Sequence, residues 1–307
     1  NNTYYIDNIT ILGVHTEHSE NLGHAFAESY LSILTAVNNW VTNGIFKDEP
    51  NITVILQNNV VSRYDNTIGV ALFERMMTLS ELQNISRDNG YEYICFNKLI
   101  VGTSQLEMLN GGIHMNQEIL KYMRYKILKY YNINPYWVPN SVNDINMLII
   151  VKNSSFWPMP HKNWVTNYES DVKRWINNKY IQVTNKKINK LTIIDPMKTA
   201  MEDQVKLVSN ASLILTQWGG GSMENFLQPL NGVQIIVTTW DPIQHYIQAK
   251  SKDIIPDFDY YYRKANGLQT ILRYNDLKGN NRIERIEMDL LYRIMDASLN
   301  ILLHNYE

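Results

Sequence analysis

Apolar residues recur along this chain with two alternating spacings. Between positions 22 and 42 they fall at helical intervals behind Asn21, a residue type that favours the start of a helix. In the first half of the chain the pattern predicts strands at 8–14, 52–56, 91–96 and 99–101 and helices at 22–42, 68–83 and 117–131. We therefore expect strands and helices to alternate, which is typical of parallel βαβ layers.

The alternation breaks off between residues 132 and 146 and then resumes. The break contains Pro135, Pro139 and five asparagines, and its apolar residues show little periodicity. After it, the pattern predicts strands at 147–151, 191–194, 212–216 and 233–238 and helices at 164–178, 201–209 and 282–304. The sequence thus predicts an α/β protein with two Rossmann-like domains, residues 1–137 and 147–265, that face one another across a cleft.

The composition excludes some classes of function and leaves the compartment open. A net charge of −2 provides no basic field for nucleic acid, and no run of about 18 apolar residues is present to span a membrane. Cys95 is the only cysteine, which favours a reducing setting, cytoplasmic or viral. The chain starts at Asn1 without a methionine, so we expect residues upstream to have been removed. An anchor lost with them would place the protein in the ER or Golgi lumen instead.

A glycine-rich turn follows the strand predicted at 212–216. Gly219, Gly220, Gly221 and Ser222 stand between that strand and a segment compatible with a helix. Backbone N–H groups at a helix start favour a phosphate, and glycine lets the backbone approach it closely. A nucleotide diphosphate fits this arrangement, with Ser222 as a further donor. A tight strand–helix connection without a ligand is the alternative, because the Gly-x-Gly-x-x-Gly fingerprint is absent.

His24 and Glu28 lie four residues apart in the first two turns of the helix predicted at 22–42. This spacing places both on one helix face, beside its apolar stripe. Such a pair is either an ordinary surface contact or the general base of a transfer reaction, which takes a proton from an attacking hydroxyl. His15 and His18 could join His24 in a zinc site, but no cysteine or carboxylate spacing supports zinc.

Four segments, in order along the chain, resemble the motifs of glycosyltransferase family 61. Asn21-x-x-His24-x-x-x-Glu28 is similar to the family's Asn-x-x-His-x-x-x-Asp/Glu motif. Cys95-Phe96, a few residues before Gly102, is similar to its Cys-Phe segment, and Glu202-Asp203-Gln204 to its helix with Glu-Gln. Gln217-Trp218-Gly219-Gly220-Gly221, with Phe226, Leu227 and Pro229 behind, resembles its His-Gly-Ala-Gly…Phe-x-Pro block. The resemblance spans roughly residues 8–265.

The resemblance implies a GT-B fold, an inverting mechanism and a UDP-sugar donor, with a hydroxyl of a glycan or glycoprotein as acceptor. It implies that Glu28 is the general base or orients it, that His24 shares this role or positions the acceptor, and that Asn21 supports them. The first domain would bind the acceptor, and helix 282–304 would pack back on it. The second domain would bind the nucleotide sugar through Trp218, Gly219, Gly220, Gly221, Ser222, Glu224, Lys152 and Lys162.

The sequence departs from the family pattern in ways that bear on the donor site. Trp218 stands where the family usually has a histidine, and Lys152 and Lys162 stand near its usual arginines. A lysine meets phosphate as a point charge, without the bidentate geometry of arginine. Both lysines could equally be ordinary solvated charges, and Glu224 could equally be a solvated glutamate rather than a ribose ligand.

Asp257-Phe258-Asp259 matches the Asp-x-Asp pair that holds a divalent ion in metal-dependent glycosyltransferases. The pair lies late in the chain, beyond the glycine turn, so we expect a metal-independent enzyme without a cofactor. Two other functions stay open. A UDP-sugar epimerase would convert free UDP-sugar without an acceptor, whereas a non-catalytic glycan- or nucleotide-binding module, which Trp218 favours, would bind without turnover.

Overall fold

The protein divides into two compact units, each built on its own parallel sheet. The first unit comprises residues 1–132 with 255–265, and the second comprises 133–254 with 266–307. The computed structural model describes residues 2–15, 19–40, 50–102, 117–139, 145–151, 172–184, 192–217, 226–230, 232–238, 271–275 and 288–304. The division at residue 132 falls where the aperiodic segment of the sequence begins.

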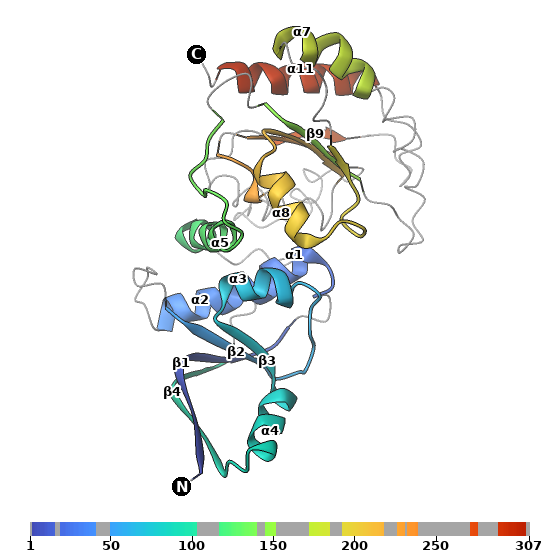
Figure 1. The fold of residues 1–307 in the computed structure, drawn as a ribbon. Coiled ribbons are helices and arrows are strands. Elements are labelled where there is room, and N and C mark those ends of the chain that lie inside the picture. Colours follow the sequence, from blue (N-terminus) through green and yellow to red (C-terminus); the bar gives the residue numbers. More distant parts are fainter. Residues whose placement is uncertain are drawn as a thin grey trace, which may run out of the picture. The chain divides into compact units, whose positions relative to one another are not determined.

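The first unit contains a four-stranded parallel sheet (Figure 1). Its strands are β1 (Thr3–Gly13), β2 (Ile52–Leu56), β3 (Arg75–Thr78) and β4 (Tyr93–Val101), in the order β3-β2-β1-β4. β2 is buried along its whole length, as expected for an inner strand of a sheet covered on both faces. The strand order is compatible with a Rossmann-like α/β fold.

Helices cover both faces of this sheet. The helices of this unit are α1 (Leu22–His24), the π-helical η1 (Ala25–Tyr30), α2 (Leu31–Trp40), the π-helical η2 (Asp65–Gly69), α3 (Val70–Leu72), α4 (Leu79–Asp88) and α5 (Gln117–Tyr130), the last of which packs on α2 and α3. On one face Ile55 and Met77 pack with Leu82 of α4, and on the other α2 lies against β1 and β4 (Figure 1). The helix predicted at 22–42 is thus present as three consecutive helical segments with a π turn in the middle.

The helix predicted at 68–83 is wrong in its middle. β3 interrupts it, because Met76 and Met77 pair with Val54 and Ile55 of β2. Thr78 then starts α4 with a capping box, in which its hydroxyl accepts from the N–H of Glu81 and the Glu81 carboxylate accepts from the N–H of Thr78. Pairing with a buried strand outweighs the helical spacing of the apolar residues here.

The second unit contains a five-stranded parallel sheet. Its strands are β5 (Met147–Ile150), β6 (Thr192–Ile194), β7 (Leu213–Gln217), β8 (Val233–Thr238) and β9 (Ile271–Asn275), in the order β6-β5-β7-β8-β9. Numbered from the first strand of this unit, the order is 2-1-3-4-5, which occurs in doubly wound sheets of the flavodoxin type. The sequence pattern predicted the first four of these strands and missed β9.

The core of the second unit brings together three elements distant in sequence. The odd-numbered positions Leu213 and Leu215 of β7 pack with Trp175, which precedes η5 (Ile176–Tyr180) and α7 (Ile181–Thr184), and with α11 (Met288–His304). α8 (Met201–Ser209) lies on the other side of the sheet (Figure 1). The final helix was expected to pack on the first unit, and this expectation needs correction. Its buried side chains Met295, Leu299 and Leu302 belong to the second core.

Both sheets have a point at which the strand order reverses direction. In the first unit the chain moves from β1 to β2 and β3 and then returns to the other side of β1 as β4. In the second unit it moves from β5 to β6 and then returns to the other side of β5 as β7. Ligands of open α/β sheets bind beyond the carboxyl ends of the strands at such reversals. A ligand site is therefore expected in the segments that follow β1 and β4 in the first unit and β5 and β7 in the second.

Replacing Leu299 with alanine tests the assignment of α11 to the second core. The side chain is buried among apolar neighbours, so its truncation should lower the free energy of unfolding by about 2–5 kcal/mol. The matched control is Asn300→Ala, an exposed change on the same helix that should stay within about 0.5 kcal/mol. Urea unfolding of both variants measures this difference. Equal unfolding midpoints for the two variants would contradict the packing of α11 in the second core.

Candidate functional site

Asn21, His24 and Glu28 lie together at the start of the first helical segment of unit one. The side-chain oxygen of Asn21 accepts a hydrogen bond from the N–H of Gly23 at 3.0 Å, which caps the helix. His24 Nδ1 lies 2.7 Å from Glu28 Oε1, within hydrogen-bonding distance. The two side chains are 32% and 24% exposed, so both stay accessible to a partner from solvent.

The chain between His24 and Tyr30 is wound as a π-helix, with α1 before it and α2 after it. Such π turns inside α-helices are frequent at functional sites, because they redirect side chains without ending the helix. Ala25, Phe26 and Tyr30 are buried, whereas Glu28 points to the half-exposed side. A carboxylate that accepts from an imidazole at this place can accept a proton from a bound hydroxyl.

The proposed nucleotide-binding residues lie outside the described residues. These are Lys152, Lys162, Trp218, Gly219, Gly220, Gly221, Ser222 and Glu224, and the same is true of Asp257 and Asp259. The structure does describe the strands that lead to the first of them. Ile150 of β5 pairs with Thr216 of β7, so the two strands end side by side. The segments that begin with Lys152 and Trp218 therefore both follow the carboxyl ends of adjacent strands, at the reversal point of the second sheet.

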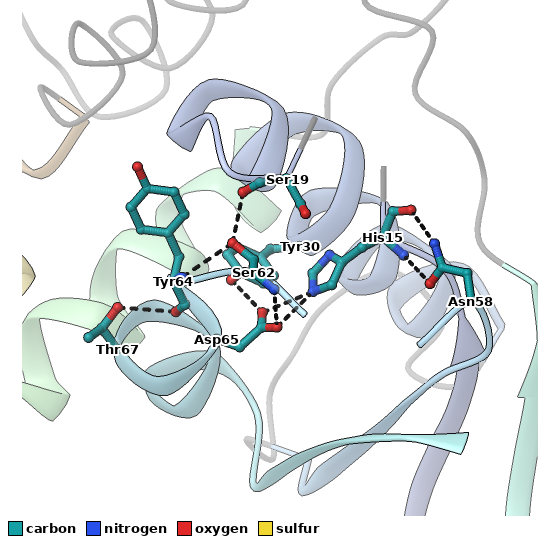
Figure 2. A network of polar contacts seen from close by, with 8 residues as sticks. All are labelled: His15, Ser19, Tyr30, Asn58, Ser62, Tyr64, Asp65 and Thr67. Carbon is teal, nitrogen blue, oxygen red and sulfur yellow. Dashed lines mark hydrogen bonds and ion pairs between the residues drawn. The ribbon is translucent and has the colours of Figure 1, made fainter. Parts of the chain in front are cut away.

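A buried polar network lies beyond the carboxyl ends of β1 and β2 (Figure 2). Its centre is Asp65, whose carboxylate accepts from His15 Nε2 at 2.9 and 3.1 Å. It also accepts from the Tyr30 hydroxyl at 2.8 Å and from the N–H of Ser62 at 2.8 Å. Four hydrogen bonds from three separate segments thus satisfy a carboxylate that has almost no contact with solvent.

The network changes the acidity of one of its members. Burial first, and then the negative charge of Asp65 and the hydrogen bond to it, raise the pKa of Tyr30 well above its ordinary value. Tyr30 ends the π-helical segment that carries Glu28. The network therefore fixes the chain at one end of that segment, while the Asn21 cap fixes it at the other.

Sequence reasoning missed this network. It considered His15 only as a zinc ligand and assigned no polar role to Tyr30 or Asp65. One signal was present, because Ser62-x-x-Asp65 has the spacing of a capping box. Only one of the two contacts of that motif is present, because the Asp65 carboxylate accepts from the N–H of Ser62, whereas the N-cap of η2 is Tyr64 and makes no side-chain cap hydrogen bond. The contacts to His15 and Tyr30 depend on the fold and leave no local trace in the sequence.

Among the described residues, no cluster of three or more His, Cys, Asp or Glu side chains is arranged to hold a metal ion. No helix of the same residues is long and apolar enough to cross a membrane. Cys95 lies half-buried on β4 and has no cysteine to pair with.

No model of a known protein family matches the chain, and no curated protein matches it significantly. The two parallel sheets make this an α/β protein, and their strand orders are compatible with a Rossmann-like fold. The residues at the carboxyl ends of these strands are therefore the basis for a functional proposal.

Replacing Tyr30 with phenylalanine tests the network through its pH dependence. Below about pH 10 the phenol keeps its proton in the folded and the unfolded chain, so losing its bond to a carboxylate should cost about 1.5–3 kcal/mol. Above about pH 10 the unfolded wild type releases this proton while the folded form retains it, so wild type loses about 1.4 kcal/mol per pH unit relative to the variant.

The stability difference between wild type and Tyr30→Phe should therefore shrink as the pH rises from 7 to 11. Urea unfolding across this range measures it. Tyr5→Phe, at a tyrosine that is 67% exposed, serves as the control and should show no difference at any pH. A constant gap between Tyr30→Phe and wild type would contradict the raised pKa.

Proposed function

We propose that this protein is an inverting, metal-independent glycosyltransferase, which moves a sugar from a UDP-sugar to a hydroxyl of a glycan or glycoprotein. The observation that carries the proposal is the pairing of β5 with β7, which brings the starts of the two candidate donor-binding segments to one edge of a parallel sheet. That edge is where nucleotides bind in open α/β sheets. The resemblance of the motifs to glycosyltransferase family 61 adds the class of reaction.

The donor site would use the segments that follow these two strands. Backbone N–H groups of Gly219, Gly220 and Gly221 would donate to the diphosphate, with Ser222 as a side-chain donor. Lys152 and Lys162 would neutralise the charge that develops on UDP as it leaves. Trp218 would contact the nucleotide sugar, and Glu224 would accept a hydrogen bond from the ribose.

The reaction needs one base and one leaving group. The acceptor hydroxyl gives its proton to Glu28, or to His24 with Glu28 as its orienting partner, while its oxygen forms a bond to the anomeric carbon. The bond from that carbon to the UDP oxygen breaks, and UDP leaves with the electron pair. A single displacement inverts the anomeric configuration. In this proposal the two units act as the two domains of a GT-B enzyme, with the acceptor bound by the first and the donor by the second.

UDP should stabilise the protein more than GDP, CMP or NAD does. A ligand that binds only the folded state at about 100 times its Kd adds about 2.7 kcal/mol, which a thermal-shift measurement detects readily. Gly220→Val places a branched side chain where the backbone must approach the phosphate, so the UDP-induced shift should disappear while the melting temperature without ligand persists.

Asn177→Val, an exposed change in the same unit, is the control and should keep the UDP-induced shift. Stabilisation by NAD with none by UDP would overturn the donor assignment. An unchanged UDP effect in Gly220→Val would place the nucleotide elsewhere.

Glu28→Gln should abolish most turnover without loss of UDP binding. The amide keeps the shape of the side chain but cannot take a proton, and loss of a general base typically costs about 10²–10⁴ in rate. A transfer assay over a panel of acceptors and UDP-sugars measures the effect, with Glu118→Gln, which alters an exposed ion pair with Lys121 in the same unit, as the control. Near-normal turnover in Glu28→Gln would return this residue to a structural role.

UDP binding without turnover on any acceptor would favour the non-catalytic module, to which Trp218 in place of the usual histidine points. Conversion of free UDP-sugar without an acceptor would favour the epimerase.

A further inference from the structure

Two buried polar atoms beyond β1 have no hydrogen-bond partner within the described residues. They are Nδ1 of His15 and Oγ of Ser19, whose residues are 2% and 1% exposed. Buried polar atoms are paired in the great majority of cases, and an unpaired one costs about 1–3 kcal/mol. These two atoms lie four residues apart along the chain, so a single bound group could pair with both.

The contacts of His15 determine what its free nitrogen can do. Asp65 already accepts from Tyr30 and from the N–H of Ser62, as an ionised carboxylate does. His15 Nε2, at 2.9 Å from the same carboxylate, must therefore carry the hydrogen. Nδ1 then accepts a hydrogen bond in the singly protonated ring and donates one in the doubly protonated ring, and a hydroxyl group can meet either requirement.

The loop after β2 holds His15 and Ser19 in place. The Asn58 side chain accepts from the N–H of His15 at 3.3 Å and donates to its carbonyl at 2.8 Å. Ser62 Oγ donates to the carbonyl of Ser19 at 2.7 Å. Figure 2 shows His15 and Ser19 as members of the same network, each held by the segment that carries Asn58 and Ser62. Rigid placement of this kind is what a binding site requires and what a solvated side chain lacks.

The position of His15 in the fold also favours a ligand site. His15 stands two residues beyond the end of β1, and β1 and β4 are the strands at which the first sheet reverses direction. The carboxyl end of such a strand pair is the usual ligand position in an open α/β sheet.

From these observations we infer that His15 and Ser19 bind a hydroxyl group of a saccharide, the acceptor in the proposed function on which this assignment rests. The Ser19 hydroxyl donates to the ligand oxygen, and the ligand hydroxyl donates to His15 Nδ1. One neutral hydroxyl thereby satisfies both atoms. A charged group would lose its hydration at so buried a place without an opposite charge to replace it.

His15→Gln separates binding from structure. The amide nitrogen of glutamine can still donate to Asp65, whereas the acceptor at the position of Nδ1 is lost. The measurement is a titration of protein labelled with ¹⁵N in its seven histidines, using the methyl glycosides of glucose, galactose, mannose, xylose and N-acetylglucosamine. The resonance missing from His15→Gln assigns His15. At least one glycoside should shift its Nδ1 signal in the wild type.

For that glycoside, His15→Gln and Ser19→Ala should each weaken binding about tenfold, the effect of one lost hydrogen bond. The melting temperature of His15→Gln should stay within a few degrees of wild type. Ser80→Ala, at the start of α4 in the same unit, is the control and should bind as wild type does.

The outcomes separate this inference from the proposed function. If no glycoside moves the His15 signal, or if His15→Gln binds like wild type, the two atoms hold an ordered water only and the inference fails. If UDP-dependent transfer occurs and is unaffected by His15→Gln, the glycosyltransferase proposal is supported and the saccharide site at His15 fails. If a glycoside shifts His15 while UDP neither binds nor supports transfer, the saccharide site stands and the glycosyltransferase proposal fails.

Discussion

A parallel strand can rejoin its neighbour only through a crossover that carries the chain back to the starting edge of the sheet. Every strand of both sheets in this protein pairs in parallel, so all carboxyl ends of a sheet meet at one edge. Chemistry-bearing segments far apart in sequence are thereby gathered at that edge. The segment after β1, with His15 and the Asn21 helix start, and the segments after β5 and β7 owe their positions to this pairing.

Asp65 links the carboxyl end of β1 to the candidate site of the first unit. Its carboxylate joins the chain beyond β1 to Tyr30 at the end of the π-helical segment. Glu28 lies two residues before Tyr30, and the Asn21 cap fixes the other end of the same short stretch. The position of the proposed base therefore depends on a buried charge that does not touch it. Removing one partner of such a buried charge is expected to disturb both stability and the geometry of the helix start.

The sequence predicted those features that local periodicity and capping determine. The helix at 201–209, the strands at 52–56 and 233–238, and the contact between His24 and Glu28 all follow from residue spacing. Residue spacing gave a wrong prediction where contacts with residues distant in sequence determine the structure. Met76 and Met77 have helical neighbours but pair with β2, and the final helix joins the second core because its apolar face packs on β8 and β9. The Asp65 network lay outside sequence reasoning for the same reason, since His15, Tyr30 and Asp65 meet only after folding.

The central claim is that the carboxyl ends of β5 and β7 lead into a UDP-sugar site. Amide hydrogen exchange with and without UDP tests this claim most directly, because it reports on each strand end separately. Peptides that cover residues 147–153 and 213–225 should become protected when UDP is added, while peptides that cover β2 should not change. Unchanged exchange in both of these regions of the second unit, at saturating UDP, would contradict the account.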